Sequence, residues 1–258
     1  MRAIIAAVLL PLAACGNSFS VDTDDRPGIP GTGSGNQRTF AASGFDSVEL
    51  AGSDDISVRV GGGFAVTAEG DAEALDTLKI TRDGGTLRVS RRNGRSRGHA
   101  RVTVTMPAIT AATLSGSGNL SVDRVEARAF KAKLAGSGNL TVATLRAEET
   151  DLSIAGSGNA ALSGRAGALD VAVAGSGNVT LAGESDRLEV SIAGSGDVAG
   201  ERLVAKAADI KVMGSGSVRA TVDGQAEVMS MGSGDVDLGA RARCSVRKMG
   251  SGSVRCGG

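Results

Sequence analysis

One short phrase, Gly-Ser-Gly followed by a polar residue, occurs eight times between Gly116 and Ser253 and constrains the fold of the chain more than any other feature. The first glycines of successive copies are separated by 18–20 residues. A fixed period of this length is typical of proteins built from stacked coils. The copies begin at Gly116, Gly136, Gly156, Gly175, Gly194, Gly214, Gly232 and Gly250.

The residues around each copy predict strands. Apolar and polar residues alternate, as in Leu140-Thr141-Val142 after one copy and Leu152-Ser153-Ile154 before the next. This period of two indicates β-structure, and two glycines flanking a serine permit positive φ and a sharp corner. One corner in 18–20 residues corresponds to one coil of a β-helix. We therefore predict an all-β, single-stranded parallel β-helix, with regular coils over residues 108–258.

The corner residues are predicted to be structural. Asn follows the corner in the first four copies, and stacked Asn side chains can hydrogen-bond amide to amide along the axis. Asp and Ser alternate there in the later copies, which separates the carboxylates. The phrase does not match the Gly-Gly-x-Gly-x-Asp repeat of calcium-binding coils, so we predict no metal and no cofactor. The predicted corner residues are Gly116, Gly118, Asn119, Gly136, Gly138, Asn139, Gly156, Gly158, Asn159, Gly175, Gly177 and Asn178.

The residue before the corner changes from Ala to Met in the last three copies, at Met213, Met231 and Met249. Such a strip is either an exposed adhesive patch or a filling for corners that have changed shape. We favour the filling, because Ser230 and Lys248 replace apolar residues nearby.

Residues 39–107 alternate in the same way but without the regular period, and we expect irregular opening coils that cap the open edge of the solenoid. Asp83-Gly84-Gly85 predicts a hairpin turn, and the segment from Asp71 to Asp76 predicts one helical turn.

The first residues predict export. Ala3 to Leu12 is an apolar run too short to span a bilayer, and Leu12-Ala13-Ala14-Cys15 resembles the lipobox of bacterial lipoprotein signal peptides. That resemblance implies cleavage after residue 14 and a diacylglycerol on Cys15; an ordinary cleaved signal peptide is the alternative. By resemblance to Gram-negative lipoproteins, Gly16 rather than Asp after the cysteine leaves the chain eligible for the outer membrane, and we expect an outer-membrane lipoprotein of the cell envelope. We expect a signal peptide at 1–14, a lipidated Cys and flexible tether at 15–38, and a β-helix domain at 39–258.

Cys244 and Cys256 lie six residues before and six after the last corner, and both offsets have the parity of the inward positions. An oxidising compartment favours a disulfide between them; two buried free thiols are the alternative.

The segment 91–101 contains the densest cluster of charge. It is either an anion-binding site, for lipid headgroups or polyanionic saccharides, or a solvated loop between strands, and we favour the loop. The single histidine nearby has no second ligand at metal-binding spacing. The arginines of this cluster are Arg91, Arg92, Arg95, Arg97 and Arg101.

The repeated Gly-Ser-Gly-Asn phrase, with Phe45-Asp46-Ser47-Val48 and the segment Val102 to Pro107, resembles the bacterial DUF2807 family of auto-transporter adhesins with a head GIN domain. The resemblance covers about residues 40–256. It implies a right-handed parallel β-helix and a role in adhesion, and it brings no catalytic residues.

The function predicted is therefore a non-catalytic binding module, anchored to the membrane by its lipid, for envelope polysaccharides or surface proteins. A structural envelope subunit is the alternative, and a polysaccharide-acting enzyme is less favoured because Asp123, Glu148, Asp151 and Asp170 share no motif. Lys and Arg total 28, as do Asp and Glu, and there is no Tyr or Trp. A balanced charge without stacking rings argues against a nucleic-acid partner.

Overall fold

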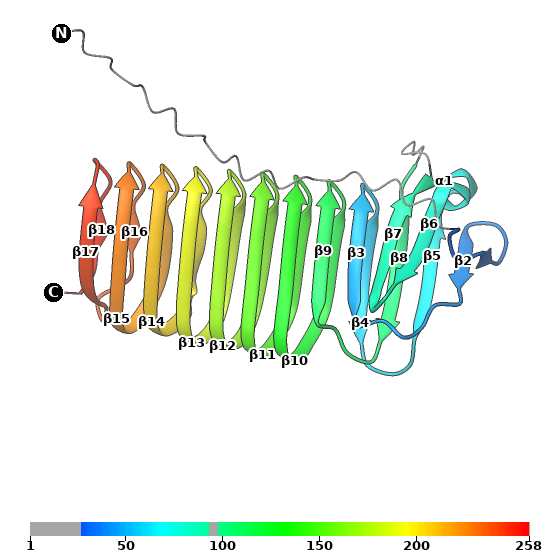
Figure 1. Cartoon of the computed structure of the whole chain (residues 1–258), viewed down its shortest axis with the longest axis horizontal. Coiled ribbons are helices and arrows are strands. Elements are labelled where there is room, and N and C mark those ends of the chain that lie inside the picture. The colour runs from blue at the N-terminus through cyan, green and yellow to red at the C-terminus, as the bar shows by residue number, and fades with distance from the viewer. Residues whose placement is uncertain (1–26, 93–97, 258) are drawn as a thin grey trace, which may run out of the picture.

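The computed structural model describes residues 27–92 and 98–257. The predicted signal peptide at 1–14, Cys15, Arg95 and Arg97 lie outside these residues. The described chain is almost entirely β-structure with one short helix, α1 (Ala72–Thr77), and its coils stack into a rod (Figure 1). The predicted parallel β-solenoid is confirmed. Within the described ranges, no helix has the length and apolar character needed to cross a membrane.

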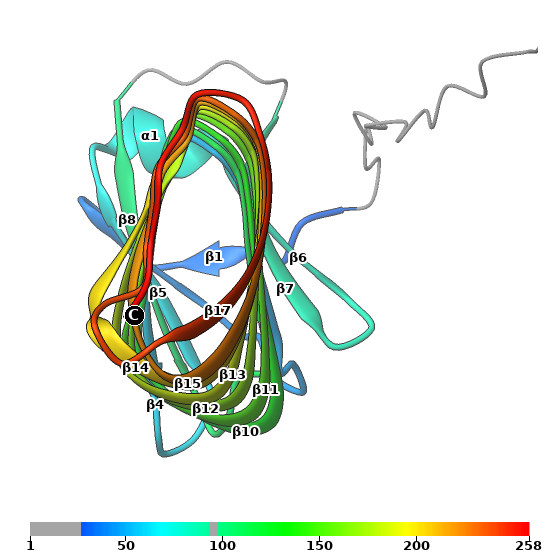
Figure 2. The same cartoon turned by 90° about the vertical axis from the view of Figure 1, so that its left-hand side faces the viewer.

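Six long strands of the described chain form the regular part of the rod, and each winds through almost a whole coil. Neighbouring strands pair parallel and in register, so that Leu120 lies beside Leu140 and Leu140 beside Ala160. Seen along the axis, successive coils superimpose as a flattened oval (Figure 2). These strands are β10 (Asn119–Gly136), β11 (Asn139–Gly156), β12 (Asn159–Gly175), β13 (Asn178–Gly194), β14 (Val198–Gly214) and β15 (Val218–Gly232).

The inward columns expected from the alternation form the core. Leu134, Ile154 and Val173, each two residues before a corner, stack on one another and are buried. Val125 and Leu145 stack in the same way at the opposite bend of the coil. Burial of each such side chain stabilises the fold by about 1.5–3 kcal/mol, so these columns are the main force that holds the coils together.

The first coils do not follow one another in sequence order. The coil formed by β3 (Ser47–Gly52) and β4 (Asp55–Val60) pairs on one side with β9 (Ala111–Gly116) and β10. Its other side pairs with β7 (Thr86–Arg91) and β8 (Ala100–Met106), which come later in the chain. The chain therefore places the β7–β8 coil outside the first coil and then returns across it to begin β9.

Antiparallel strands cover this end of the rod. β5 (Ala65–Gly70) pairs with β8, and β6 (Leu78–Asp83) forms a hairpin with β7 through the predicted turn at Gly84 and Gly85. The short helix α1 lies at the predicted helical turn and joins β5 to β6. Antiparallel pairing replaces the missing next coil, which explains why the regular period fails in this region.

The folded part of the chain begins earlier than predicted. β1 (Gly31–Thr32) lies within the segment expected to be a flexible tether, and β2 (Gln37–Phe40) begins in it; the two form an antiparallel hairpin, and β2 pairs with β5. The sequence gives little indication of this hairpin, because β2 pairs through its backbone and buries one large side chain, Phe40.

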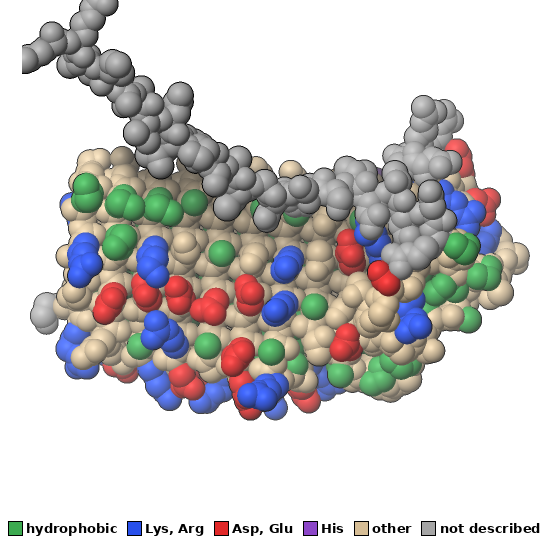
Figure 3. Space-filling model, viewed as in Figure 1, with side chains coloured by type: hydrophobic (Ala, Val, Ile, Leu, Met, Phe, Trp, Pro, Cys, Tyr) green, Lys and Arg blue, Asp and Glu red, His purple; other side chains and the backbone are tan. Residues whose placement is uncertain are grey.

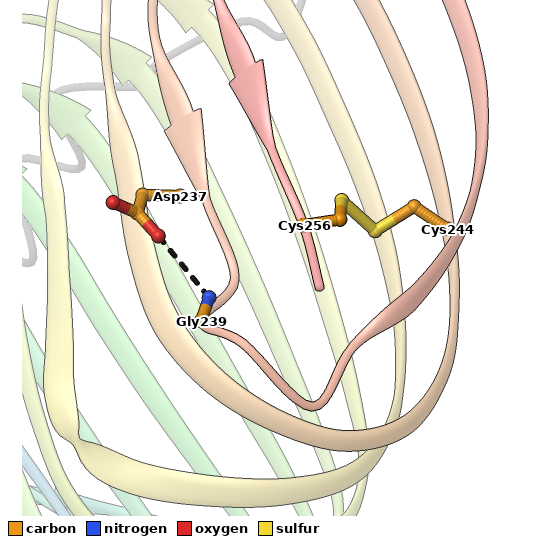
Figure 4. The surroundings of a disulfide bond; sticks show 4 residues. All are labelled: Asp237, Gly239, Cys244 and Cys256. Carbon is orange, nitrogen blue, oxygen red and sulfur yellow. Dashed lines mark hydrogen bonds between the residues drawn. A yellow bond between two sulfur atoms is a disulfide. The ribbon is translucent and has the colours of Figure 1, made fainter. Parts of the chain in front are cut away.

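The last coil consists of β16 (Val236–Asp237), β17 (Arg243–Met249) and β18 (Val254–Arg255). A disulfide joins Cys244 on β17 to Cys256 just after β18, with 6.2 Å between the Cα atoms (Figure 4). Both cysteines pack against the core, as the parity of their positions predicted. The predicted disulfide is confirmed, and it closes the final coil across its interior.

Candidate functional site: the outer face of the coils

The two glycines of each corner are required for different reasons. The first has a φ between 125° and 140° in all eight copies. In the first five copies, its carbonyl oxygen accepts two hydrogen bonds from the next coil. Gly116 O, for example, accepts from the backbone N–H of Ser137 (3.0 Å) and of Gly138 (3.1 Å). The second glycine does not have positive φ, contrary to expectation. A Cβ at Gly138 would lie 2.1 Å from the carbonyl oxygen of Gly118, so the second glycine is needed for close stacking.

The predicted amide ladder follows the corners. Each side-chain amide donates to the amide oxygen of the coil before it, over 2.8 Å for Asn139 to Asn119 and 3.1 Å for both Asn159 to Asn139 and Asn178 to Asn159. The row ends on Asp55, whose carboxylate accepts from the Asn119 amide at 2.7 Å. A carboxylate only accepts hydrogen bonds, so it completes a row in which every amide points the same way.

Asp54 takes the place of the second corner glycine in the first coil. Its carboxylate is buried and forms two hydrogen bonds with the Arg91 guanidinium, one of them 2.6 Å from Nε to Oδ2. It also accepts the Ala100 N–H at 2.8 Å, and Arg91 in turn donates to Thr77 Oγ1 at 2.7 Å. This buried pair therefore connects the first coil to the capping strands.

The pairing with Asp54 removes Arg91 from the predicted anion-binding arginine cluster. The side chain of Arg91 is 5% exposed and is committed to Asp54, so it is not available to an external anion. Arg92 and Arg101 are exposed, and Arg101 lies on β8 between Asp55 and Glu69. The anion site considered for the five arginines therefore lacks Arg91. Acidic residues flank Arg101.

A row of carboxylates that was not predicted crosses the outer face of the coils. These residues lie five positions before each corner and are register partners from strand to strand. Parallel strands are about 4.8 Å apart, so each carboxylate lies one strand from the next. Figure 3 shows this acidic row in red along the rod. We call the surface the ladder face and define it by Asp151, Asp170, Glu189, Asp209 and Glu227.

The charges of the ladder face are only partly neutralised. The Lys211 ammonium lies 3.3 Å from Glu189 and 3.4 Å from Asp209, and these hydrogen bonds and charges raise the pKa of Lys211. At Asp170, partial burial and then the charges of Glu189 and Asp151 raise the pKa of the carboxyl group. The row is thus a line of mutually repelling acids.

The methionines border the ladder face, and the prediction that they fill the corners is wrong. Met213 is 47% exposed, Met231 is 38% exposed and Met249 is 73% exposed, and the three stack in one outer row. Position parity explains the error: a residue directly before the corner points outward, whatever happens to the inward column beside it. Methionine on a surface is a flexible apolar contact for partners.

The remaining candidate acids have structural partners. Asp123 accepts the backbone N–H of Val60 at 2.9 Å, and Glu148 lies 3.4 Å from Arg128 on the adjacent coil. Asp151 and Asp170 belong to the acidic row. Within residues 27–92 and 98–257, no group of three or more His, Cys, Asp or Glu side chains has the arrangement to hold a metal ion.

A known family has the same repeat. The sequence model of DUF2807, described as "Putative auto-transporter adhesin, head GIN domain", matches residues 44–181 and 167–242. The chain belongs to the DUF2807 family. The resemblance found in the sequence is therefore confirmed. A search of curated proteins gives no match.

Solved structures share the fold of this DUF2807 chain. A crystal structure described as a "putative lipid binding protein" from Parabacteroides distasonis has a TM-score of 0.77 at 23% identity, covering 88% of this chain and 98% of the other. A "putative adhesin" from the same species gives 0.72 at 20% identity, covering 88% and 99%. A "putative adhesin" from Parabacteroides merdae gives 0.71 at 18% identity, covering 88% and 97%. At these identities the likeness supports the β-solenoid fold.

Proposed function

We propose that this DUF2807 chain is a cell-envelope lipoprotein, anchored in the outer membrane through Cys15, whose solenoid is a non-catalytic adhesion or binding module. The observation that carries the proposal is the ladder face. It presents the same chemical group at one-strand intervals along five coils, on a surface that is extended rather than enclosed. Solenoids use such surfaces to bind long partners. Envelope polysaccharides and surface proteins have the necessary length.

The chemistry of the face favours binding over catalysis. Hydrolysis of a glycosidic bond needs two carboxyl groups with different roles, one kept protonated and one ionised. The acidic row instead lies on an extended, open surface, and Asp123 and Glu148 are held by structural contacts. The adhesin description of the family supports a binding role at the cell surface.

The anchor is tested separately from the binding face. In cells labelled with a palmitate analogue, the wild-type chain should incorporate the label and sediment with the membranes. Cys15→Ser should remove the label and shift the chain to the soluble fraction. Loss of the label without release from membranes would contradict anchoring through Cys15.

The binding face is tested with the full chain carrying Cys15→Ser, incubated with isolated envelopes and with whole cells. We expect saturable binding that falls at least fivefold in the triple variant Asp170→Asn, Glu189→Gln, Asp209→Asn. A matched control, Glu126→Gln, Glu148→Gln, Glu184→Gln, removes three carboxylates outside the row and should bind like the parent. Absence of any retained envelope component would instead favour a purely structural subunit.

A further inference from the structure

The C-terminal end of the rod differs from the rest in charge. Residues 240–258 contain five cations and no Asp or Glu, although the chain as a whole is neutral. Arg241 is paired with Asp223 at 3.4 Å, and the Lys248 ammonium donates to the Gly252 carbonyl at 2.7 Å within the last corner. Within the described residues, Arg243 and Arg247 form no ion pair, and both point outward from β17. Their positive charge is therefore available to a partner.

The same end has an unpaired strand edge. In the described part of the chain, β17 pairs with β15 on one side, over the seven residues from Arg243 to Met249, and with no strand on the other. The opposite end of the rod is covered by antiparallel strands, so the two ends are not equivalent (Figure 1). An exposed strand edge presents backbone donors and acceptors that can bind an added strand.

Apolar surface accompanies the open edge. Val246 occupies the inward column in which Val228 is buried, but it is 44% exposed because no coil among the described residues covers it. Met249, three residues further along β17, points outward and is 73% exposed. A strand added to β17 would cover Val246 with its own inward residue and extend the methionine row.

We propose that the β17 edge binds an extended acidic segment of a partner polypeptide, which adds one strand to the end of the solenoid. In parallel register with β17, acidic residues of this segment face Arg243 and Arg247, and an apolar residue between them lies over Val246. Charge complementarity selects the partner, and backbone hydrogen bonds and apolar contact hold it. This edge is separate from the ladder face, so the proposal does not depend on the function proposed above.

Other occupants fit less well. Two copies joined end to end would bring two sets of unpaired cations together, which is destabilising. A lipid bilayer would leave the edge N–H and C=O groups without hydrogen-bond partners, and the acids Glu227 and Asp209 on the adjoining coils would repel anionic headgroups. A polysaccharide would find no aromatic ring in residues 240–258 on which to stack.

The test uses the full chain with Cys15→Ser and a fluorescent, end-blocked peptide of the sequence Glu-Ala-Ser-Val-Glu-Ser-Leu. We expect saturable binding by anisotropy, slower hydrogen exchange across Arg243–Met249, and at least a tenfold loss of affinity in Arg243→Glu, Arg247→Glu. The matched control Lys131→Glu, Lys133→Glu changes two outward cations on β10, whose two edges are both paired, and should bind the peptide like the parent.

A charge swap gives the decisive result. The peptide with Lys in place of both Glu residues should not bind the parent chain and should bind the Arg243→Glu, Arg247→Glu variant. The proposal is overturned if neither peptide binds, if binding is the same in the reversed variant, or if the parent binds phosphatidylglycerol vesicles instead. It is also overturned if the parent forms a concentration-dependent dimer by sedimentation, since a second copy would then occupy the edge.

Discussion

Asp151 and Asp170 are register partners on adjacent parallel strands, so two carboxylates face solvent one strand apart. The next partner of Asp170 is Glu189, which places Asp170 between two acids. Burial and these two charges raise the pKa of Asp170 above its ordinary value of 3.8. A carboxyl group with a raised pKa destabilises the folded state when it is ionised, because folding partly buries the charge and brings it beside like charges.

We therefore expect Asp170→Asn to stabilise the protein at pH 7. Like charges on neighbouring strands cost roughly 0.2–1 kcal/mol, and salt screens part of this at an exposed site. The gain should be complete above the folded-state pKa, shrink as the pH falls through that value, and vanish below the unfolded value, where Asp170 is protonated in both states. Urea unfolding at pH 7 and pH 3, in low salt, measures the difference.

Glu148→Gln is the control for this series. The Glu148 carboxylate lies beside Arg128 rather than in the acidic row, so its removal should give no gain at pH 7. Equal stabilisation by both substitutions would show that total charge, and not the row, is responsible.

The second corner glycine gives a prediction that separates steric from conformational effects. At Gly138 a Cβ would lie 2.1 Å from the backbone oxygen of Gly118, although the φ of Gly138 is not positive. Gly138→Ala must push two coils apart. It should lower the free energy of unfolding by about 1–3 kcal/mol, the usual range for overpacking. Gly63→Ala is the control, because nothing lies within 4 Å of its added Cβ and its φ is also not positive. Chemical unfolding should show a lower stability for Gly138→Ala than for Gly63→Ala. Similar stabilities would contradict the claim that close stacking of the coils requires glycine at position 138.

The buried pair of Asp54 and Arg91 predicts a large loss from either single substitution. Arg91→Ala leaves a carboxylate that is 1% exposed without its counter-charge, and breaking such a pair typically costs about 3–5 kcal/mol. Arg92→Ala, at the exposed neighbouring position, should change stability by less than about 0.5 kcal/mol.

A double-mutant cycle tests the coupling directly. Asp54→Ala, Arg91→Ala should be less destabilised than the sum of the two single variants, because neither charge is then buried alone. Additive losses in thermal or urea unfolding would mean that the two side chains act independently, against the contact that the structure shows.

The period of the repeat determines much of this molecule. Stacking places every offset from the corner in one line, which is why the core columns, the Asn119 to Asn178 ladder and the inward cysteines could be predicted. The acidic row follows from the same rule and was open to prediction, since its members all lie five residues before a corner. The outward direction of Met213 also follows from parity, and the changes in the neighbouring inward column had no bearing on it.

The opening region could not be predicted in the same way. The pair of Asp54 and Arg91 depends on the β7–β8 coil lying outside the β3–β4 coil, a reversal of order that no local pattern encodes. The β1–β2 hairpin depends on backbone pairing with β5, and its sequence resembles a linker. Contacts made through the backbone, or between coils that are out of sequence order, do not produce a periodic pattern in the amino-acid sequence.

The disulfide between Cys244 and Cys256 gives the last prediction. It closes a separation of 12 residues in the last coil that the structure describes, and cross-links of this length stabilise by up to about 3 kcal/mol in the chain-entropy model. Coils of a solenoid contact their neighbours alone, so Cys244→Ser, Cys256→Ser should loosen β17 and β18 while leaving β10 to β13 unchanged. Hydrogen exchange resolved along the chain measures this, with faster exchange expected across Arg243–Met249, and reduction of the wild-type chain should reproduce the pattern. Uniformly faster exchange along the whole rod would contradict the nearest-neighbour account, and unchanged exchange in β17 would show that its pairing with β15 is sufficient without the bond.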